Sequence, residues 1–205
     1  MGSGRGKTRR TKAAVDPRTL DPRREALANK DWGHYLALHG HEEVLEAFVT
    51  LQDQLEGKEY WELLRDVWIR AEQIQPRDVW AQLLTQHEGA RTAIMTEEER
   101  AHLASLPEQI TVYRGVGNPE HQQGFSWTLD RQRAEWFAQR FLDQPIAAMF
   151  RLTSFDPNHK AEPVLVTGVV SRKDVIAYLA QRDEQELVVL PEKVKVESAR
   201  KLKLL

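Results

Sequence analysis

The sequence predicts an α+β protein, with a helical N-terminal part followed by a mixed β-sheet that carries one or two helices. Apolar residues recur at helical spacing between residues 41 and 105, whereas β-rich runs appear only after Pro107. Hydrophobic residues make up 41% of the 205 residues, which is enough for a substantial core. We therefore divide the chain into a disordered basic tail (1–25), a helical region (26–106) and a β-rich domain (107–205).

Several helices are expected in the region before Pro107. Gly57 separates two apolar stripes, and Pro76 opens a third helical segment. Thr96 followed by Glu99 forms a capping box that starts a fourth, short helix. The spacing of the tryptophans in this region is more typical of a helix–helix core than of a binding site. The stripes consist of Val44, Leu45, Phe48, Val49 and Leu55, and of Trp61, Leu64, Trp68 and Ala71.

The β-rich domain is expected to contain strands interrupted by one helix. That helix is predicted at about residues 130–142, where Ala134, Phe137 and Ala138 lie on one face and Asp130 or Thr128 can cap the start. The strand runs are Ile110–Tyr113, Val164–Val170, Leu187–Leu190 and Lys193–Val196.

The composition excludes several classes of function. The chain has no cysteine, which removes disulfides, thiolate catalysis and cysteine-ligated zinc. It has no apolar run near the roughly 18 residues that cross a bilayer, and its start lacks the apolar segment of a secretory signal. We expect a cytoplasmic protein without a membrane partner, acting in a bacterial or phage-infected cell.

The charge is unevenly distributed. The first twelve residues hold five lysines and arginines and no acidic residue, although the whole chain has a net charge of −2. A basic tail of this kind can contact nucleic acid or an acidic partner, or it can serve only as a solubilising segment. We favour the solubilising role over nucleic-acid binding.

The histidines do not form a recognisable metal site. His34, His39 and His41 lie near Glu42 and Glu43, but their spacings differ from the i, i+4 pair that places two imidazoles on one helical face. A solvated helix start explains this cluster better. The chain also lacks a Gly-x-Ser-x-Gly nucleophile motif, so a serine nucleophile is not expected.

Two short elements in the second half combine strand character with polar side chains. Tyr113-Arg114-Gly115 places a guanidinium at the end of a β run, with a glycine that permits close approach of another backbone. Ser126-Trp127-Thr128 is a short β-like stretch in which both hydroxyls share one face.

A pair of glutamates precedes the apolar run Leu187–Leu190. If the strand extends back through them, Glu184 and Glu186 lie on the same face, about 6.6 Å apart along the chain. Such a pair is either a solvated strand end or a working pair of carboxylates.

Taken together and in this order, the three elements resemble the motifs of the mono-ADP-ribosyltransferase superfamily, in its Arg–Ser–Glu branch. Tyr113-Arg114-Gly115 is similar to the first-strand arginine, Ser126-Trp127-Thr128 to the Ser-x-Ser/Thr element, and Glu184-Gln185-Glu186 to the Glu-x-Glu strand. The resemblance covers about residues 108–197 and not the helical region. It implies an ADP-ribosyltransferase-like catalytic domain at 107–205 that uses NAD+ as its substrate and needs no metal.

The chemistry of ADP-ribose transfer assigns roles to these residues. Breaking the nicotinamide–ribose bond produces an oxocarbenium-like ribose, which the Glu186 carboxylate can stabilise while it grips a ribose hydroxyl. Glu184 can orient or deprotonate the acceptor. Arg114 suits the pyrophosphate, since a guanidinium makes bidentate contacts with phosphate. Ser126 can hold the catalytic carboxylate and touch the ribose, and Thr128 can support Ser126 from the same face, so both are expected to contribute to NAD+ binding.

The remaining candidates line the expected NAD+ site. Gly115 permits close approach of the backbone, and Trp127, Phe137 or Tyr178 can offer an aromatic face to the nicotinamide. The family often has a smaller residue at the position of Trp127. The loop before the glutamates, residues 181–183, is short and lacks an aromatic residue, which leaves the acceptor unidentified.

We expect an NAD+-dependent mono-ADP-ribosyltransferase that modifies a protein acceptor and releases nicotinamide. Paired glutamates often accompany arginine modification in the resembling family. The alternative is a non-catalytic module on the same scaffold that binds NAD+ or a protein partner. A toxin, a phage effector and a cellular regulator are all compatible with the chain.

Overall fold

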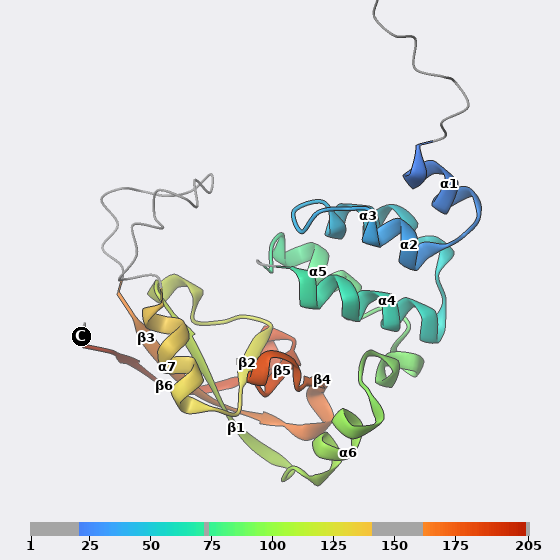
Figure 1. The fold of residues 1–205 in the computed structure, drawn as a ribbon. Coiled ribbons are helices and arrows are strands. Elements are labelled where there is room, and N and C mark those ends of the chain that lie inside the picture. Colours follow the sequence, from blue (N-terminus) through green and yellow to red (C-terminus); the bar gives the residue numbers. More distant parts are fainter. Residues whose placement is uncertain (1–20, 72–73, 141–161, 204–205) are drawn as a thin grey trace, which may run out of the picture.

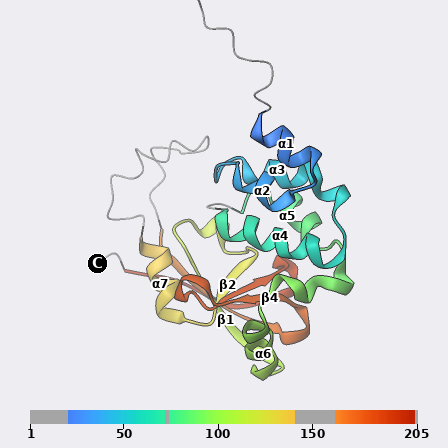
Figure 2. The same ribbon diagram turned by 45° about the vertical axis from the view of Figure 1, so that its right-hand side comes forward.

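A computed structural model describes residues 21–71, 74–140 and 162–203, which form a helical part and a six-stranded sheet (Figure 1). The helical part lies against the side of the sheet that carries β4, β5 and β2 (Figures 1 and 2). Residues 1–20 of the basic tail lie outside the described residues. The helices are α1 (Pro22–Ala28), α2 (Trp32–Ala37), α3 (Val44–Leu51), α4 (Gly57–Arg70), α5 (Arg77–Leu83), α6 (Glu97–Ser105) and α7 (Arg131–Gln139).

The helices predicted after residue 41 are confirmed. Gly57 begins α4 with a φ of 53°, a conformation that glycine adopts without strain. At the start of α6, the Thr96 hydroxyl accepts from the Glu99 backbone, and the Glu99 carboxylate accepts from the Thr96 backbone, as the capping box requires. The expected coil through residue 25 is wrong, because α1 begins at Pro22. Its start signal is Asp21, whose carboxylate caps the helix directly before a proline at the first position.

The strands are β1 (Gln109–Val116), β2 (Ser126–Thr128), β3 (Val164–Ser171), β4 (Val175–Leu179), β5 (Glu186–Val189) and β6 (Lys195–Lys201), in the order β4-β5-β2-β1-β3-β6. Every neighbouring pair is antiparallel, so the predicted mixed sheet is wrong. A parallel pair needs a long crossover, and the connection that contains α7 leads from β2 to β3, which are not neighbours.

Two other predictions of elements need correction. The sequence pattern did not indicate β4, because all five of its residues are buried and no polar alternation marks a strand. The last strand was predicted at residues 193–196 but runs over Lys195–Lys201, an edge strand whose residues are mostly exposed. Of the helix predicted at residues 130–142, the described part is α7, and residues 141–142 lie outside it.

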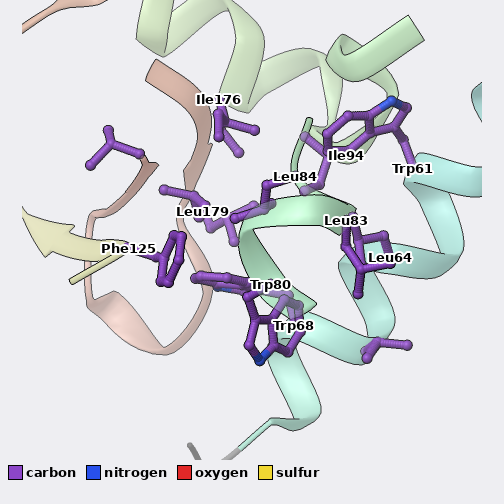
Figure 3. Packing of buried hydrophobic residues seen from close by; sticks show 14 of the residues in the cluster. Trp61, Leu64, Trp68, Trp80, Leu83, Leu84, Ile94, Phe125, Ile176 and Leu179 are labelled. Atoms are coloured by element: carbon purple, nitrogen blue, oxygen red, sulfur yellow. The ribbon is translucent and has the colours of Figure 1, made fainter. Parts of the chain in front are cut away.

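The helical part and the sheet share one hydrophobic core. Trp80 of α5 and Leu64 of α4 are completely buried, and the same cluster includes Phe125, next to β2, and Leu179 of β4 (Figure 3). The four tryptophans before residue 81 are all buried, which confirms their assignment to helix–helix core. The switch from helical spacing to β-rich runs near residue 106 therefore separates two kinds of secondary structure, and both pack into a single core.

A buried ion pair joins α4, α6 and the end of β4. The Arg65 guanidinium donates to both carboxylate oxygens of Glu99, at 2.6 and 3.0 Å, and also to the Ile94 carbonyl at 2.7 Å. Glu99 in turn accepts from the Ala180 backbone at 2.9 Å. Burial alone would raise the pKa of Glu99, but the hydrogen bonds from Arg65, Ala180 and Thr96 outweigh burial and lower that pKa below its ordinary value.

We predict that Glu99→Gln destabilises the protein by about 3–5 kcal/mol at pH 7, because it leaves the buried Arg65 charge without its partner. The pKa of Glu99 is lower in the folded chain, so its contribution is complete well above pH 4.5 and is lost as the pH falls through the folded pKa. Urea unfolding from pH 7 downward measures both effects. Glu97→Gln, an exposed change in the same helical turn, serves as the control; equal losses in the two variants would contradict the prediction.

Candidate functional site

The first two sequence elements lie on the adjacent strands β1 and β2, and Glu186 of the third lies on β5, which pairs with β2. Tyr113 pairs with Thr128, and Thr128 pairs with Glu186, so these three side chains share one face. Arg114 alternates onto the other face, which also carries Trp127. The structure thus brings the elements together in the sheet but does not place all their side chains on one face.

Arg114 acts as a clamp on the chain that leads into β2. Its guanidinium donates from Nε to the His121 carbonyl at 3.2 Å and from Nη1 to the Ser126 carbonyl at 2.7 Å. A Cβ at Gly124 would lie 2.5 Å from the guanidinium carbon, so any other residue there would have to displace the Arg114 guanidinium. Burial, aided by the charge of Arg77, lowers the pKa of Arg114 to about 10, and the Glu186 carboxylate opposes this shift.

The middle element divides into one accessible residue and two residues that serve the fold. Ser126 is half-buried and pairs with Val188 of β5. Trp127 is almost fully buried and donates its indole N–H to the Gly124 carbonyl at 2.9 Å, so its ring packs in the core rather than in an open site. The buried Thr128 hydroxyl donates to the Glu184 carbonyl at 2.5 Å and accepts from the Asp130 backbone at 3.0 Å.

The two glutamates do not form a strand pair, and the expected spacing along a strand is wrong. The strand β5 begins at Glu186, whereas Glu184 follows a 3₁₀ turn (η6, Gln181–Asp183) and has helical dihedral angles. Between them, Gln185 has a φ of 44°, in the left-handed region. The chain therefore turns between the two carboxylates, because the Thr128 hydroxyl holds the Glu184 carbonyl and the Leu129 N–H holds that of Gln185.

Glu186 lies at the contact between the sheet and the helical part. Its Oε2 accepts the indole N–H of Trp68, on α4, at 3.2 Å. It also lies close enough to Arg114 for its negative charge to raise the pKa of that guanidinium, against the effect of burial. No sequence pattern could have indicated Trp68, because it precedes Glu186 by 118 residues and has the apolar spacing of a core residue.

The end of α7 carries a cluster of aromatic and cationic side chains. Trp136 is 51% exposed and meets the Phe137 ring edge to face, with centroids 5.2 Å apart. Arg140 lies over both rings, 4.6 Å from the Phe137 centroid, and Arg133 lies 5.4 Å from that of Trp136. Of the three aromatic candidates, Phe137 is therefore the one beside a cationic surface.

Tyr178 occupies a different position. It is buried, and its ring stacks on the His102 imidazole of α6 with centroids 4.4 Å apart. This contact belongs to the packing of α6 on β4, so the ring has no face left for a ligand of the size of nicotinamide.

Arg140 is a candidate that sequence reasoning missed. Burial lowers its pKa, while the nearby Glu184 carboxylate opposes that shift. The signal was present in the sequence, because a residue three positions after Phe137 lies on the same side of a helix. Arg140 thus connects the aromatic cluster to the segment that leads into β5.

Gly115 positions α7 on the sheet. A Cβ at this residue would lie 1.7 Å from the Ala134 carbonyl oxygen and 2.7 Å from the Ala138 nitrogen, so the helix rests directly on the backbone of β1. The close approach predicted for Gly115 is confirmed, but its partner is α7. The helix carries Phe137 and Arg140, so this contact fixes where both side chains emerge.

A cleft of about 450 Å³ is lined by residues of α2, α4 and η6. Its lining includes Leu36 of α2, Asp66 and Arg70 of α4, and Gln181 of η6. None of the residues predicted to bind NAD+ lines it. Gln181 belongs to η6, the turn that directly precedes Glu184.

Comparison of the chain with protein-family models, with curated proteins and with solved structures found no match. Within the described ranges, no group of three histidine, aspartate or glutamate side chains is placed to hold a metal ion. No helix in the part of the chain that the structure describes is long and apolar enough to cross a membrane.

We predict that Gly115→Ala destabilises the protein by about 1–3 kcal/mol or more, because its methyl group must displace α7 from β1. Gly117→Ala is the matched control, since a Cβ there has its nearest contact at 3.9 Å. Urea unfolding of the two variants gives the comparison. Equal stability of Gly115→Ala and the wild-type protein would show that the helix does not rest on this backbone.

Proposed function

We propose that this protein is an NAD+-dependent mono-ADP-ribosyltransferase that transfers ADP-ribose to a protein acceptor and releases nicotinamide. One observation carries the proposal: three elements that are distant in the sequence, containing Arg114, Ser126 and Glu186, occupy the adjacent strands β1, β2 and β5. The order of the motifs in the sequence does not require their strands to be adjacent, so the adjacency supports the three residues acting together.

Glu186 is the residue that we assign to bond cleavage. Its carboxylate stabilises the positive charge that develops on the ribose as the bond to nicotinamide breaks, and nicotinamide leaves as a neutral base with the bonding electrons. The Trp68 indole and the half-buried position at the start of β5 limit the movement of this carboxylate. Ser126 is the accessible hydroxyl nearest to it on the paired strand β2.

The pyrophosphate of NAD+ has a better candidate partner in Arg140 than in Arg114. Two of the donor nitrogens of Arg114 already bind backbone carbonyls, which suits a residue that shapes the site. Arg140 lies at the end of α7, beside the half-buried Phe137 ring and near Glu184. A guanidinium next to an aromatic ring suits a ligand that presents phosphates beside a planar base.

Glu184 is assigned to the acceptor. It lies outside β5 and near Arg140, on the segment that leads into the strand, so it can orient or deprotonate an incoming side chain. Arginine is the acceptor side chain to test first, because paired glutamates often accompany arginine modification in the resembling family.

We predict that Glu186→Gln lowers nicotinamide release by about a hundredfold or more, because an amide cannot stabilise the developing cation. Release is measured from NAD+ with purified protein, and unfolding by urea confirms that the fold is kept. Glu184→Ala is the companion variant: it retains NAD+ cleavage but loses transfer to the acceptor. Activity of Glu186→Gln equal to that of the wild-type protein would end the assignment.

We predict that Arg140→Ala raises the Kd for NAD+ about tenfold or more, since it removes a charged contact with the pyrophosphate. Calorimetry with NAD+ measures the change. Arg131→Ala is the control, because Arg131 is an exposed arginine on the same helix and pairs with Glu135. An equal effect of the two substitutions would indicate non-specific attraction and refute a site at Arg140.

The alternative is a module that binds NAD+ without cleaving it. This alternative is favoured by the hydrogen bonds that Glu186 and Arg114 already make within the protein. Glu186 accepts from the Trp68 indole, and Arg114 donates to backbone carbonyls. Calorimetry and nicotinamide release, performed on the same sample, separate the two functions. Binding without release would favour the non-catalytic module.

A further inference from the structure

The helical part supplies a hydrogen-bond donor, the Trp68 indole, to the candidate catalytic residue Glu186. The Trp68 indole Nε1 donates to Glu186 Oε2 at 3.2 Å, and Trp68 itself is only 3% exposed. The acceptor is the carboxylate that the proposed function needs at the reacting ribose. A hydrogen bond from a buried, rigid donor to such a carboxylate restricts its rotation and selects one orientation.

Trp68 is held in place from two directions. Its ring meets that of Trp80 edge to face, with centroids 5.0 Å apart and an interplanar angle of 85° (Figure 3). Arg65, one turn earlier on α4, is tied to Glu99 and through it to the Ala180 backbone, next to the end of β4. The indole is therefore fixed relative to the strands that carry Glu186 and its neighbours.

We infer that Trp68 is a positioning residue for the Glu186 carboxylate, and that the helical part thereby completes the active site. This inference rests on the proposed function, because it assigns the carboxylate to the ribose. Trp68 donates to Oε2 of Glu186 and so sets the orientation in which this carboxylate faces the ribose. The helical part is then a constituent of the catalytic machinery, beyond any role in recognising the target.

The chain offers a matched control in the same cluster. Trp80 is completely buried and touches Trp68, but its own indole nitrogen has no hydrogen-bond partner within the described residues. Trp68→Phe and Trp80→Phe therefore remove similar indoles from one core, and only the first removes a hydrogen bond to Glu186. A general loss of packing affects both variants, whereas loss of positioning affects one.

The first experiment compares kinetics. Trp68→Phe is expected to lower kcat for nicotinamide release about tenfold or more, as for loss of a hydrogen bond to a charged group, while KM for NAD+ changes little. Trp80→Phe keeps an aromatic ring at the position that contacts Trp68 and keeps the Trp68 hydrogen bond to Glu186, so it is expected to lower kcat by a much smaller factor than Trp68→Phe. A kcat that is unchanged or raised in Trp68→Phe, or lowered equally in both variants, would overturn the positioning role.

The second experiment detects the contact without relying on activity or on a change to Trp68. In ¹H–¹⁵N spectra of the full chain, Glu186→Gln is expected to shift the Trp68 indole cross-peak, assigned by its loss in Trp68→Phe, and to leave that of Trp80 nearly unmoved. An unmoved Trp68 cross-peak refutes the inference whatever the activity. A wild-type protein that shows the contact but cleaves no NAD+ refutes the proposed function and, with it, the catalytic role of Trp68.

Discussion

The arrangement of the whole molecule depends on the buried pair between Arg65 and Glu99. Both carboxylate oxygens of Glu99 accept from Arg65, and the same carboxylate accepts the Ala180 N–H at the end of β4. Removing two charges from water costs free energy. That cost is offset because each lone pair of the Glu99 carboxylate accepts a hydrogen bond, from Arg65, Thr96 or Ala180. These bonds fix α4 against the sheet directly before the chain turns toward Glu186. The position of Trp68, one helical turn beyond Arg65, follows from that contact.

A second constraint acts from the other side of the candidate site, where α7 rests on the bare backbone of Gly115. The helix cannot move closer, and its position determines where Phe137 and Arg140 emerge. Arg114 meanwhile binds the carbonyls of His121 and Ser126 and holds the segment before β2. Two helices from different parts of the chain therefore border the candidate site. Trp68 comes from α4, and Phe137 and Arg140 come from α7 and its C-terminal end.

Sequence reasoning succeeded where a local rule determines the structure. The capping box at Thr96, the glycine at residue 57, the buried tryptophans and the close approach at Gly115 each depend on neighbours in the chain or on residue type. It failed where a tertiary contact overrides the local pattern. The alternation of Glu184 and Glu186 suggested one strand, but hydrogen bonds to Thr128 and Leu129 turn the chain at Gln185. Trp68 has a core pattern, and only the folded chain brings it to Glu186.

The same division explains which roles changed. Trp127 and Thr128, which the motif offered as ligands of NAD+, are used by the fold itself, the first as a core ring and the second as a double hydrogen-bond anchor. Arg140 replaces Arg114 as the proposed partner of the NAD+ pyrophosphate.

The most direct test of the proposed function is incubation of the protein with a cell lysate and NAD+ labelled on its adenylate portion, followed by mapping of the labelled chains. The proposed function requires covalent label on an acceptor protein when Glu186 is intact and none with Glu186→Gln; absence of both label and released nicotinamide from the wild-type reaction would contradict it.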